Sequence, residues 1–201
     1  LAAKEPILDL LKDKSALAIG PGITTDPETV ALIGELLPLI ECPLVIDADA
    51  LNAISNHKDW LGKLKPETVL TPHPKEMSRL IGVSTQEIQR TRIATASKFA
   101  TNHSVTLVLK GSPSLIGLAD GTVVINSTGN AGMATGGSGD VLTGIIAGFM
   151  AQGLSSQEAS IAGTYMHGLA GDHFTEKASE TTLIAGDLLR CLPDTLRRIL
   201  P

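Results

Sequence analysis

Short apolar runs recur along the first half of the chain, each followed by glycine or polar residues. These runs occupy residues 15–19, 44–46, 68–71 and 105–109. An apolar run of this length without polar alternation is typical of a strand buried on both faces of a parallel sheet. Helical patterns lie between the runs, at residues 27–37, 74–81 and 86–100. The alternation of strands and helices predicts βαβ units and a parallel sheet.

After the fourth run, the pattern predicts an antiparallel hairpin and then three helices. The expected hairpin strands cover residues 115–118 and 122–125, joined through Asp120–Gly121. The expected helices cover residues 140–152, 155–174 and 184–192. Ser155 and Glu158 have the spacing of a capping box, which supports the start of the second helix. We therefore expect an α/β domain whose sheet is mostly parallel and carries an antiparallel hairpin at one edge.

The composition fits one domain with a substantial core, because 43% of the 201 residues are hydrophobic and 18% are charged. The net charge of −5 provides no broad positive field for a nucleic-acid backbone. No apolar run approaches the roughly 18 residues of a membrane-spanning helix. The two cysteines, Cys42 and Cys191, lack metal-ligand spacing and are typical of a reducing compartment. We expect a cytoplasmic protein without nucleic-acid or membrane partners.

The strongest chemical signal is the glycine-rich segment 126–140, which follows the last predicted strand and leads into an apolar helix. Its five glycines allow several backbone N–H groups to point at one place, and the start of the helix adds partial positive charge. This arrangement predicts a phosphate site. Asp140 is unusual there because a carboxylate repels phosphate. It acts either as an active-site base, which we favour, or as the helix N-cap.

Two further segments follow predicted strands, at the edge where open α/β sheets bind ligands. In the first segment, residues 71–76, His73 could donate to a ligand and Glu76 could hold a magnesium-bound water. Alternatively, the flanking prolines stiffen a turn and Glu76 lies in the first turn of a helix. In the other, residues 110–114, Lys110 suits a nucleotide phosphate or ribose, although a lone lysine is more commonly solvated.

The remaining polar candidates have simpler interpretations. Gly20–Pro21–Gly22 by itself indicates a turn. Asp47 and Asp49 follow the second predicted strand, and we favour helix caps over site residues for both. We expect His167 to pack within a helix face rather than to act in catalysis. Surface positions are expected for His57, His103 and His173.

Five segments, taken in order, closely resemble the ADP-dependent NAD(P)H-hydrate dehydratases. They cover residues 20–22, 45–52, 71–76, 110–114 and 132–142, within a resemblance that spans residues 16–192. The last segment is the most discriminating. Because this family has a ribokinase-like fold, the resemblance implies a three-layer α/β/α architecture and a single domain over residues 1–201. It also implies that the N-terminal segment usual in the family is missing from the chain.

The resemblance implies repair of damaged nicotinamide cofactor. The (6S) hydrate of NADH or NADPH would be dehydrated while ADP is converted to AMP and phosphate, with Mg²⁺ as a cofactor and Glu76 as its water-mediated ligand. Gly22, His73 and Asp140 would contact the hydrated nucleotide, and Asp140 would be catalytic. The adenine nucleotide would contact Lys110, Gly111, Ser112, Pro113, Ser114, Gly136, Gly137, Ser138 and Gly139. Ser114 stands where family members usually have Thr, and it keeps the hydroxyl.

The implied chemistry agrees with the residues of the glycine-rich segment. A hydroxyl leaves poorly, so its conversion to a phosphate ester makes elimination feasible. Asp140 would take the hydroxyl proton as the oxygen attacks the terminal phosphate, and the loop amides would stabilise the charge. We also expect a homo-oligomer and an NAD(P)H-hydrate epimerase as functional partner. The alternatives are a ribokinase-like kinase for a vitamin-precursor alcohol and a catalytically silent nucleotide-binding domain.

Overall fold

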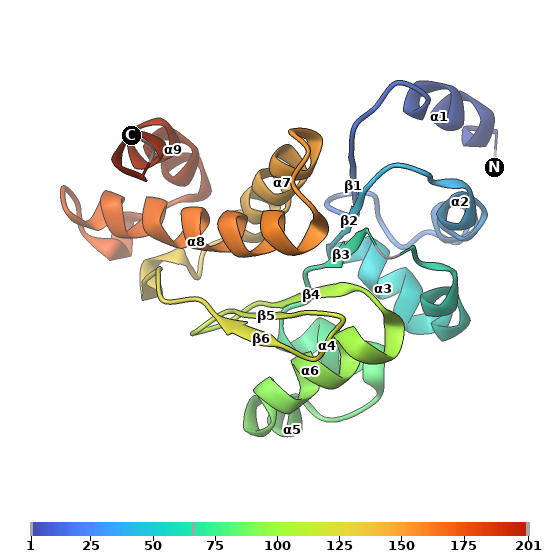
Figure 1. Cartoon of the computed structure of the whole chain (residues 1–201), viewed down its shortest axis with the longest axis horizontal. Coiled ribbons are helices and arrows are strands. Elements are labelled where there is room, and N and C mark those ends of the chain that lie inside the picture. The colour runs from blue at the N-terminus through green and yellow to red at the C-terminus, as the bar shows by residue number, and fades with distance from the viewer. Residues whose placement is uncertain (1, 66, 200–201) are drawn as a thin grey trace.

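The computed structural model describes residues 2–65 and 67–199. They form a six-stranded sheet, covered by helices, whose strands lie side by side in the order β1 to β6. The strands are β1 (Leu17–Ile19), β2 (Leu44–Ile46), β3 (Thr68–Leu70), β4 (Thr106–Leu109), β5 (Leu115–Gly117) and β6 (Val123–Ile125). The first four pair in parallel, and β5 and β6 pair antiparallel beyond β4. The predicted sheet, mostly parallel with a hairpin at one edge, is confirmed (Figure 1).

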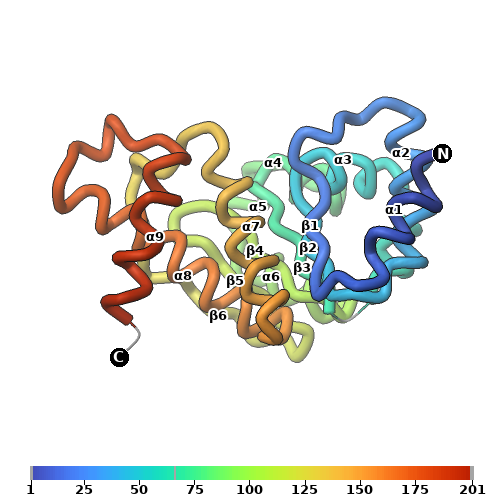
Figure 2. Tube along the Cα trace, turned by 90° about the horizontal axis from the view of Figure 1, so that it is seen from above, coloured from blue at the N-terminus to red at the C-terminus, as the bar shows by residue number. Residues whose placement is uncertain are grey.

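Helices connect and cover the strands. Those of the described chain are α1 (Lys4–Leu11), α2 (Pro27–Leu36), α3 (Ala48–Asn56), α4 (Pro74–Ile81), α5 (Thr85–Arg90), α6 (Arg92–His103), α7 (Ser138–Ala151), α8 (Ser156–Thr175) and α9 (Ala185–Ile199). Short 3-10 helices are η1 (Leu37–Leu39), η2 (Lys58–Lys63), η3 (Ala131–Met133) and η4 (Glu180–Thr182). Viewed from above, the two ends of the chain lie at opposite ends of the molecule (Figure 2).

The sheet is buried on both faces because successive side chains of a strand point to opposite sides. Val45, Val69 and Val108 pack with α7 and α8 in one apolar cluster. The neighbouring Ile46 and Leu70 pack with α2 to α6 in the other. Two helical layers therefore enclose the sheet, which confirms the expected three-layer architecture.

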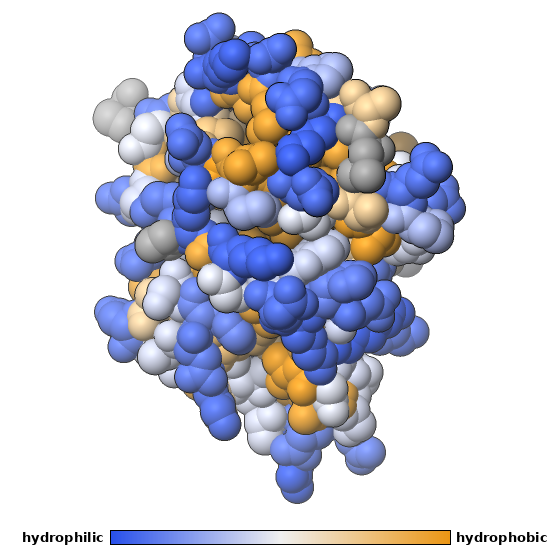
Figure 3. Space-filling model, turned by 90° about the vertical axis from the view of Figure 1, so that its right-hand side faces the viewer, coloured by the Kyte–Doolittle hydropathy of each residue, from blue (hydrophilic) through white to orange (hydrophobic). Residues whose placement is uncertain are grey.

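β1 forms one end of the sheet and is less enclosed than the central strands. Ala18 is exposed and its strand neighbours are only half-buried, whereas every residue of β2 and β3 is buried. Figure 3 shows the face at this end of the molecule, where apolar patches lie among polar side chains. Among the helices of the described residues, none is long and apolar enough to cross a membrane.

Two of the predicted helices differ from those observed by more than two residues. The predicted helix over residues 86–100 is divided at Thr91, whose backbone is neither helical nor extended (φ −120°, ψ 27°) and whose hydroxyl donates to the Glu87 carbonyl oxygen at 2.8 Å. The helix expected to end at residue 192 continues to Ile199 with Pro193 inside it. A proline removes one helical hydrogen bond, and packing of this helix on α8 offsets the loss.

Candidate active site at the carboxyl edge of the sheet

Three parallel strands and the start of α7 meet at one edge of the sheet. Asp47 directly follows β2, His73 follows β3 after a short turn, and Lys110 directly follows β4. The first turn of α7 faces the lysine, since a Cβ atom added to Gly139 would lie 3.2 Å from Lys110 Nζ. Open α/β sheets bind their ligands at this edge.

A buried ion pair connects the strand ends beneath α7. Lys110 Nζ lies 2.8 Å from Asp47 Oδ1 and 3.8 Å from Glu76 Oε2, and the Thr143 hydroxyl donates to Asp47 Oδ2 at 2.8 Å. Asp47 is 1% exposed and its side chain makes no capping hydrogen bond to α3. The cap interpretation of Asp47 is therefore wrong, because the carboxylate is engaged across the sheet edge. The solvated alternative for Lys110 is also wrong.

His73 and Glu76 form a reciprocal cap at the start of α4. His73 Nδ1 accepts from the backbone N–H groups of Lys75 and Glu76, and Glu76 Oε2 accepts the His73 N–H at 2.8 Å. Burial lowers the pKa of His73, so the ring is neutral near pH 7. With Nδ1 as acceptor, Nε2 carries the proton and lies 3.3 Å from Glu76 Oε1. Glu76 occupies the first helical turn, as its structural alternative anticipated.

Protein ligands alone do not build a metal site here. Within residues 2–65 and 67–199, no three His, Cys, Asp or Glu side chains cluster closely enough to hold a metal ion. Glu76 contributes one carboxylate to this edge, and it faces Lys110. Magnesium is commonly bound by one or two carboxylates together with substrate phosphates. The residues present therefore fit magnesium only in company with a nucleotide.

Asp140 lies in the first turn of α7 with an exposed side chain. The N-cap of this helix is Gly137, in the left-handed region at φ 83°. The N-cap alternative for Asp140 is therefore wrong. Its carboxylate makes no hydrogen bond or ion pair with the part of the chain that the structure describes, so it is available to a ligand beside the helix start.

One face of α8 holds the beginning of the glycine-rich segment. The Thr128 hydroxyl donates to the Tyr165 carbonyl oxygen at 2.8 Å. The Asp172 carboxylate accepts from the Gly129 N–H at 2.8 Å and from the Asn130 side-chain amide at 3.1 Å. The signal in the sequence was an aspartate at the end of a helical stretch rich in small residues, and we did not recognise it.

The same helix also holds the other end of the segment. His167 Nε2 lies 3.3 Å from the Ser138 hydroxyl. Burial is the main cause that lowers the pKa of His167, to about 4, so this ring is neutral. Between these ends the loop approaches α8 closely, because a Cβ atom at Gly171 would lie 2.5 Å from Met133 Sδ. His167 packs in the helix as expected, and it additionally contacts the loop.

The remaining predicted ligand segments border this edge. Gly22 follows β1 in the expected turn, is exposed and has φ 71°. Asp49 makes no capping contact and accepts the Thr24 N–H at 3.0 Å. In the loop after β4, Ser112 and Pro113 are exposed, and the half-buried Ser114 hydroxyl donates to the Gly111 carbonyl oxygen at 3.1 Å.

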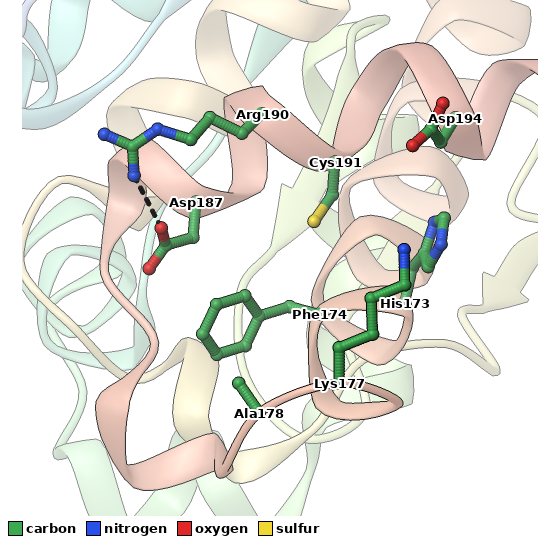
Figure 4. Close-up of a pocket in the computed structure, with 8 residues that line it drawn as sticks. All are labelled: His173, Phe174, Lys177, Ala178, Asp187, Arg190, Cys191 and Asp194. Carbon is green, nitrogen blue, oxygen red and sulfur yellow. Dashed lines mark hydrogen bonds and ion pairs between the residues drawn. The ribbon is translucent and has the colours of Figure 1, made fainter.

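The other histidines and the cavity between α8 and α9 lie apart from this edge. His57 is exposed and His103 half-buried, but the surface prediction for His173 is wrong, because it is 4% exposed and lies 3.3 Å from the Thr195 hydroxyl. A cavity of about 310 Å³ between α8 and α9 is lined by His173 and seven other residues (Figure 4). None of the residues that line this cavity is a predicted ligand contact. The helix hairpin that forms it buries the histidine.

The family model and the similar sequences agree on one family. A family model described as NAD(P)H-hydrate dehydratase matches residues 1–194. The bifunctional NAD(P)H-hydrate repair enzyme Nnr of Moorella thermoacetica is 48% identical over 98% of this chain. The chain spans 37% of that relative's length.

Solved structures give the same result for the fold. The ADP/ATP-dependent NAD(P)H-hydrate dehydratase of Bacillus subtilis, co-crystallised with ATP and Mg²⁺, superposes with a TM-score of 0.81 at 33% identity, covering 94% of this chain and 66% of that one. A ribokinase-like superfamily protein of Enterococcus faecalis V583 gives 0.83 at 29% identity, over 96% and 66% of the two chains. The expected ribokinase-like fold is confirmed.

Proposed function

This chain belongs to the NAD(P)H-hydrate dehydratase family, and we propose that it dehydrates the (6S) hydrate of NADH or NADPH while converting ADP to AMP and phosphate. The observation that carries this proposal is the start of α7. There Asp140 is exposed and has no partner among the described residues, and it directly follows Gly139, whose backbone faces the Lys110 ammonium. A base and an anion site at one helix start are what phosphorylation of a hydroxyl requires.

In this function the terminal phosphate of the nucleotide lies against the amides of Gly136 to Gly139 and near Lys110. The N-terminus of α7 contributes partial positive charge to the same place. Asp140 takes the proton of the substrate hydroxyl while the hydroxyl oxygen attacks the terminal phosphorus of ADP and AMP leaves. Loss of phosphate from the ester carbon and of a proton from the neighbouring ring carbon then restores the double bond of the dihydronicotinamide ring. Gly22 and His73 border the hydrated nucleotide, and His73 donates from Nε2.

The loop of residues 110–114 binds the adenine nucleotide beside the end of β4. Ser114 keeps a hydroxyl at the end of this loop, where it lies against the Gly111 carbonyl oxygen. Glu76 would hold the water shell of a Mg²⁺ ion bound to the nucleotide, and that ion would neutralise charge on the transferred phosphoryl group.

The cellular setting follows the same proposal. We place the enzyme in the cytoplasm, as a homo-oligomer, with an NAD(P)H-hydrate epimerase as its functional partner. The relative from Moorella thermoacetica is named as a bifunctional repair enzyme, and this chain matches only a part of it. Neither nucleic acid nor a membrane is a partner in this proposal.

The test is incubation of the protein with NADH hydrate, Mg²⁺ and either ADP or ATP. Turnover restores the near-ultraviolet absorbance of the dihydronicotinamide ring and releases AMP from ADP. A preparation of the Asp140→Asn variant serves as the control for contaminating activity.

Two outcomes would contradict this function. Phosphorylation of a vitamin-precursor alcohol with the hydrate left unchanged would identify a kinase of the same superfamily. Nucleotide binding without turnover of either substrate would identify a silent binding domain.

A further inference from the structure

The loop of residues 110–114 is held from behind by one arginine at the start of α6. Arg92 Nη2 donates to the carbonyl oxygens of Pro113 at 2.6 Å and Leu109 at 3.3 Å, and Nη1 reaches that of Lys110 at 3.5 Å. Nη1 also donates to Gln89 Oε1 at 3.1 Å. No carboxylate pairs with Arg92 among the described residues, so its positive charge is shared only with neutral oxygens.

These contacts fix the direction of two backbone N–H groups. In a trans peptide the N–H of one residue points opposite to the carbonyl of the preceding residue. Because the carbonyls of Lys110 and Pro113 point toward Arg92, the N–H groups of Gly111 and Ser114 point away from it, toward the ligand side of the loop. Within the described part of the chain, neither N–H donates to another group.

Gly111 shows that the loop shape and the arginine depend on each other. Its φ is 147°, in a region that side chains disfavour, and an added Cβ atom would lie 2.5 Å from Arg92 Nη1. Only glycine allows the guanidinium to approach the loop backbone this closely. The backbone conformation of the loop and its close contact with Arg92 therefore both depend on glycine at position 111.

We propose that Arg92 is a positioning residue for the adenine nucleotide: it holds the 110–114 backbone so that the Gly111 and Ser114 N–H groups meet the nucleotide's phosphate or ribose oxygens. The inference rests on the proposed assignment of this loop to the nucleotide. The uncompensated charge of Arg92 adds a favourable field for the anion behind the two donors.

Calorimetry with ADP on Arg92→Met and Arg92→Lys tests the proposal without requiring turnover. We expect Arg92→Met to weaken ADP binding about tenfold or more, because the loop loses the charged hydrogen bonds that orient its two N–H donors. Arg92→Lys keeps the charge but cannot span three carbonyl oxygens, so its loss is intermediate. Arg90→Met is the matched control, because Arg90 is exposed and pairs with Glu87.

The kinetic signature separates positioning from general destabilisation. KM for ADP should rise in both Arg92 variants, while KM for the hydrate and kcat at saturating ADP stay near the parent values. ADP affinity within twofold of the parent in folded Arg92→Met, or in Arg92→Lys if the former does not fold, overturns the proposal. A parent protein that binds no ADP also overturns it. A parent that binds ADP but leaves the hydrate unchanged contradicts only the proposed function, and loss of that binding in Arg92→Met still supports the inference.

Discussion

Asp47 and Lys110 form an ion pair beneath the proposed phosphate position. Each side chain compensates the charge of the other. Removing one partner of a fully buried pair leaves an uncompensated charge, which typically costs about 3–5 kcal/mol. We expect Asp47→Ala to lower the free energy of unfolding, measured by urea denaturation, by less than this, because the Lys110 side chain is 18% exposed and also faces Glu76. Asp49→Ala, which loses only the contact to the Thr24 N–H, is the control. Equal stability of the two variants would argue against the ion pair.

Asp140 is the proposed base, and its side chain does not cap α7. Asp140→Asn keeps the shape of the side chain but removes the base, so turnover should fall by about 100-fold or more. Thermal stability and ADP affinity should change little, because the carboxylate has no described protein partner. Single-turnover rates and calorimetry on the same preparation measure both effects. Residual turnover above about one part in a hundred would exclude Asp140 as the base.

His167 makes the stability depend on pH in a defined direction. Its pKa is lowered to about 4 in the folded protein, whereas an unfolded histidine titrates near 6.5. The unfolded chain therefore binds the proton first as pH falls. The stability that the neutral ring provides is complete above about pH 6.5 and is lost progressively toward pH 4, by about 3 kcal/mol.

Denaturation of parent and His167→Gln across this range isolates that contribution, since the other histidines remain in both proteins. We expect a shallower decline between about pH 6.5 and 4 in the variant. Parallel curves would show that His167 does not titrate as described.

At the scale of the elements, α8 determines the shape of the glycine-rich loop. Asp172 holds the Gly129 N–H and the Asn130 amide, and a loop released from it would sample several positions. Misplacement by about 1 Å can cost on the order of 100-fold in rate, so we expect Asp172→Ala to lower kcat at least tenfold. Amide hydrogen exchange of residues 129–137 should accelerate in parallel. Asp194→Ala, a change at an exposed residue of α9, is the control. Unchanged hydrogen exchange in Asp172→Ala would show that Asp172 does not hold the loop.

At the scale of the whole molecule, the proposed function makes the distance between two elements select the nucleotide. In that proposal the adenosine end lies at the 110–114 loop after β4, and the terminal phosphate lies at the start of α7. If this span suits a diphosphate, a triphosphate carries its terminal phosphate past the in-line position. We therefore expect higher initial rates with ADP than with ATP at equal concentration, and AMP as the product. A clear advantage for ATP would contradict this geometry.

The sequence by itself determined the strands and the order of their connections. Apolar runs such as residues 44–46 and 105–109 are local signals, because a strand buried on both faces must be apolar throughout. The capping box of Ser155 and Glu158 is equally local, and it is present in the structure. The glycine-rich segment predicts an anion site for the same reason, since backbone freedom and a helix start are properties of consecutive residues.

Only the tertiary structure decided which polar side chains meet. Asp47, Lys110 and Thr143 are far apart in the sequence, and nothing local distinguishes a helix cap from a buried ion pair. The same applies to Arg92 behind its loop and to Asp172 on α8. Parallel strands bring their carboxyl ends to one edge, so contacts between those ends depend on sheet order and register. Short-range sequence patterns do not specify these contacts, because the side chains come together only when the sheet has formed.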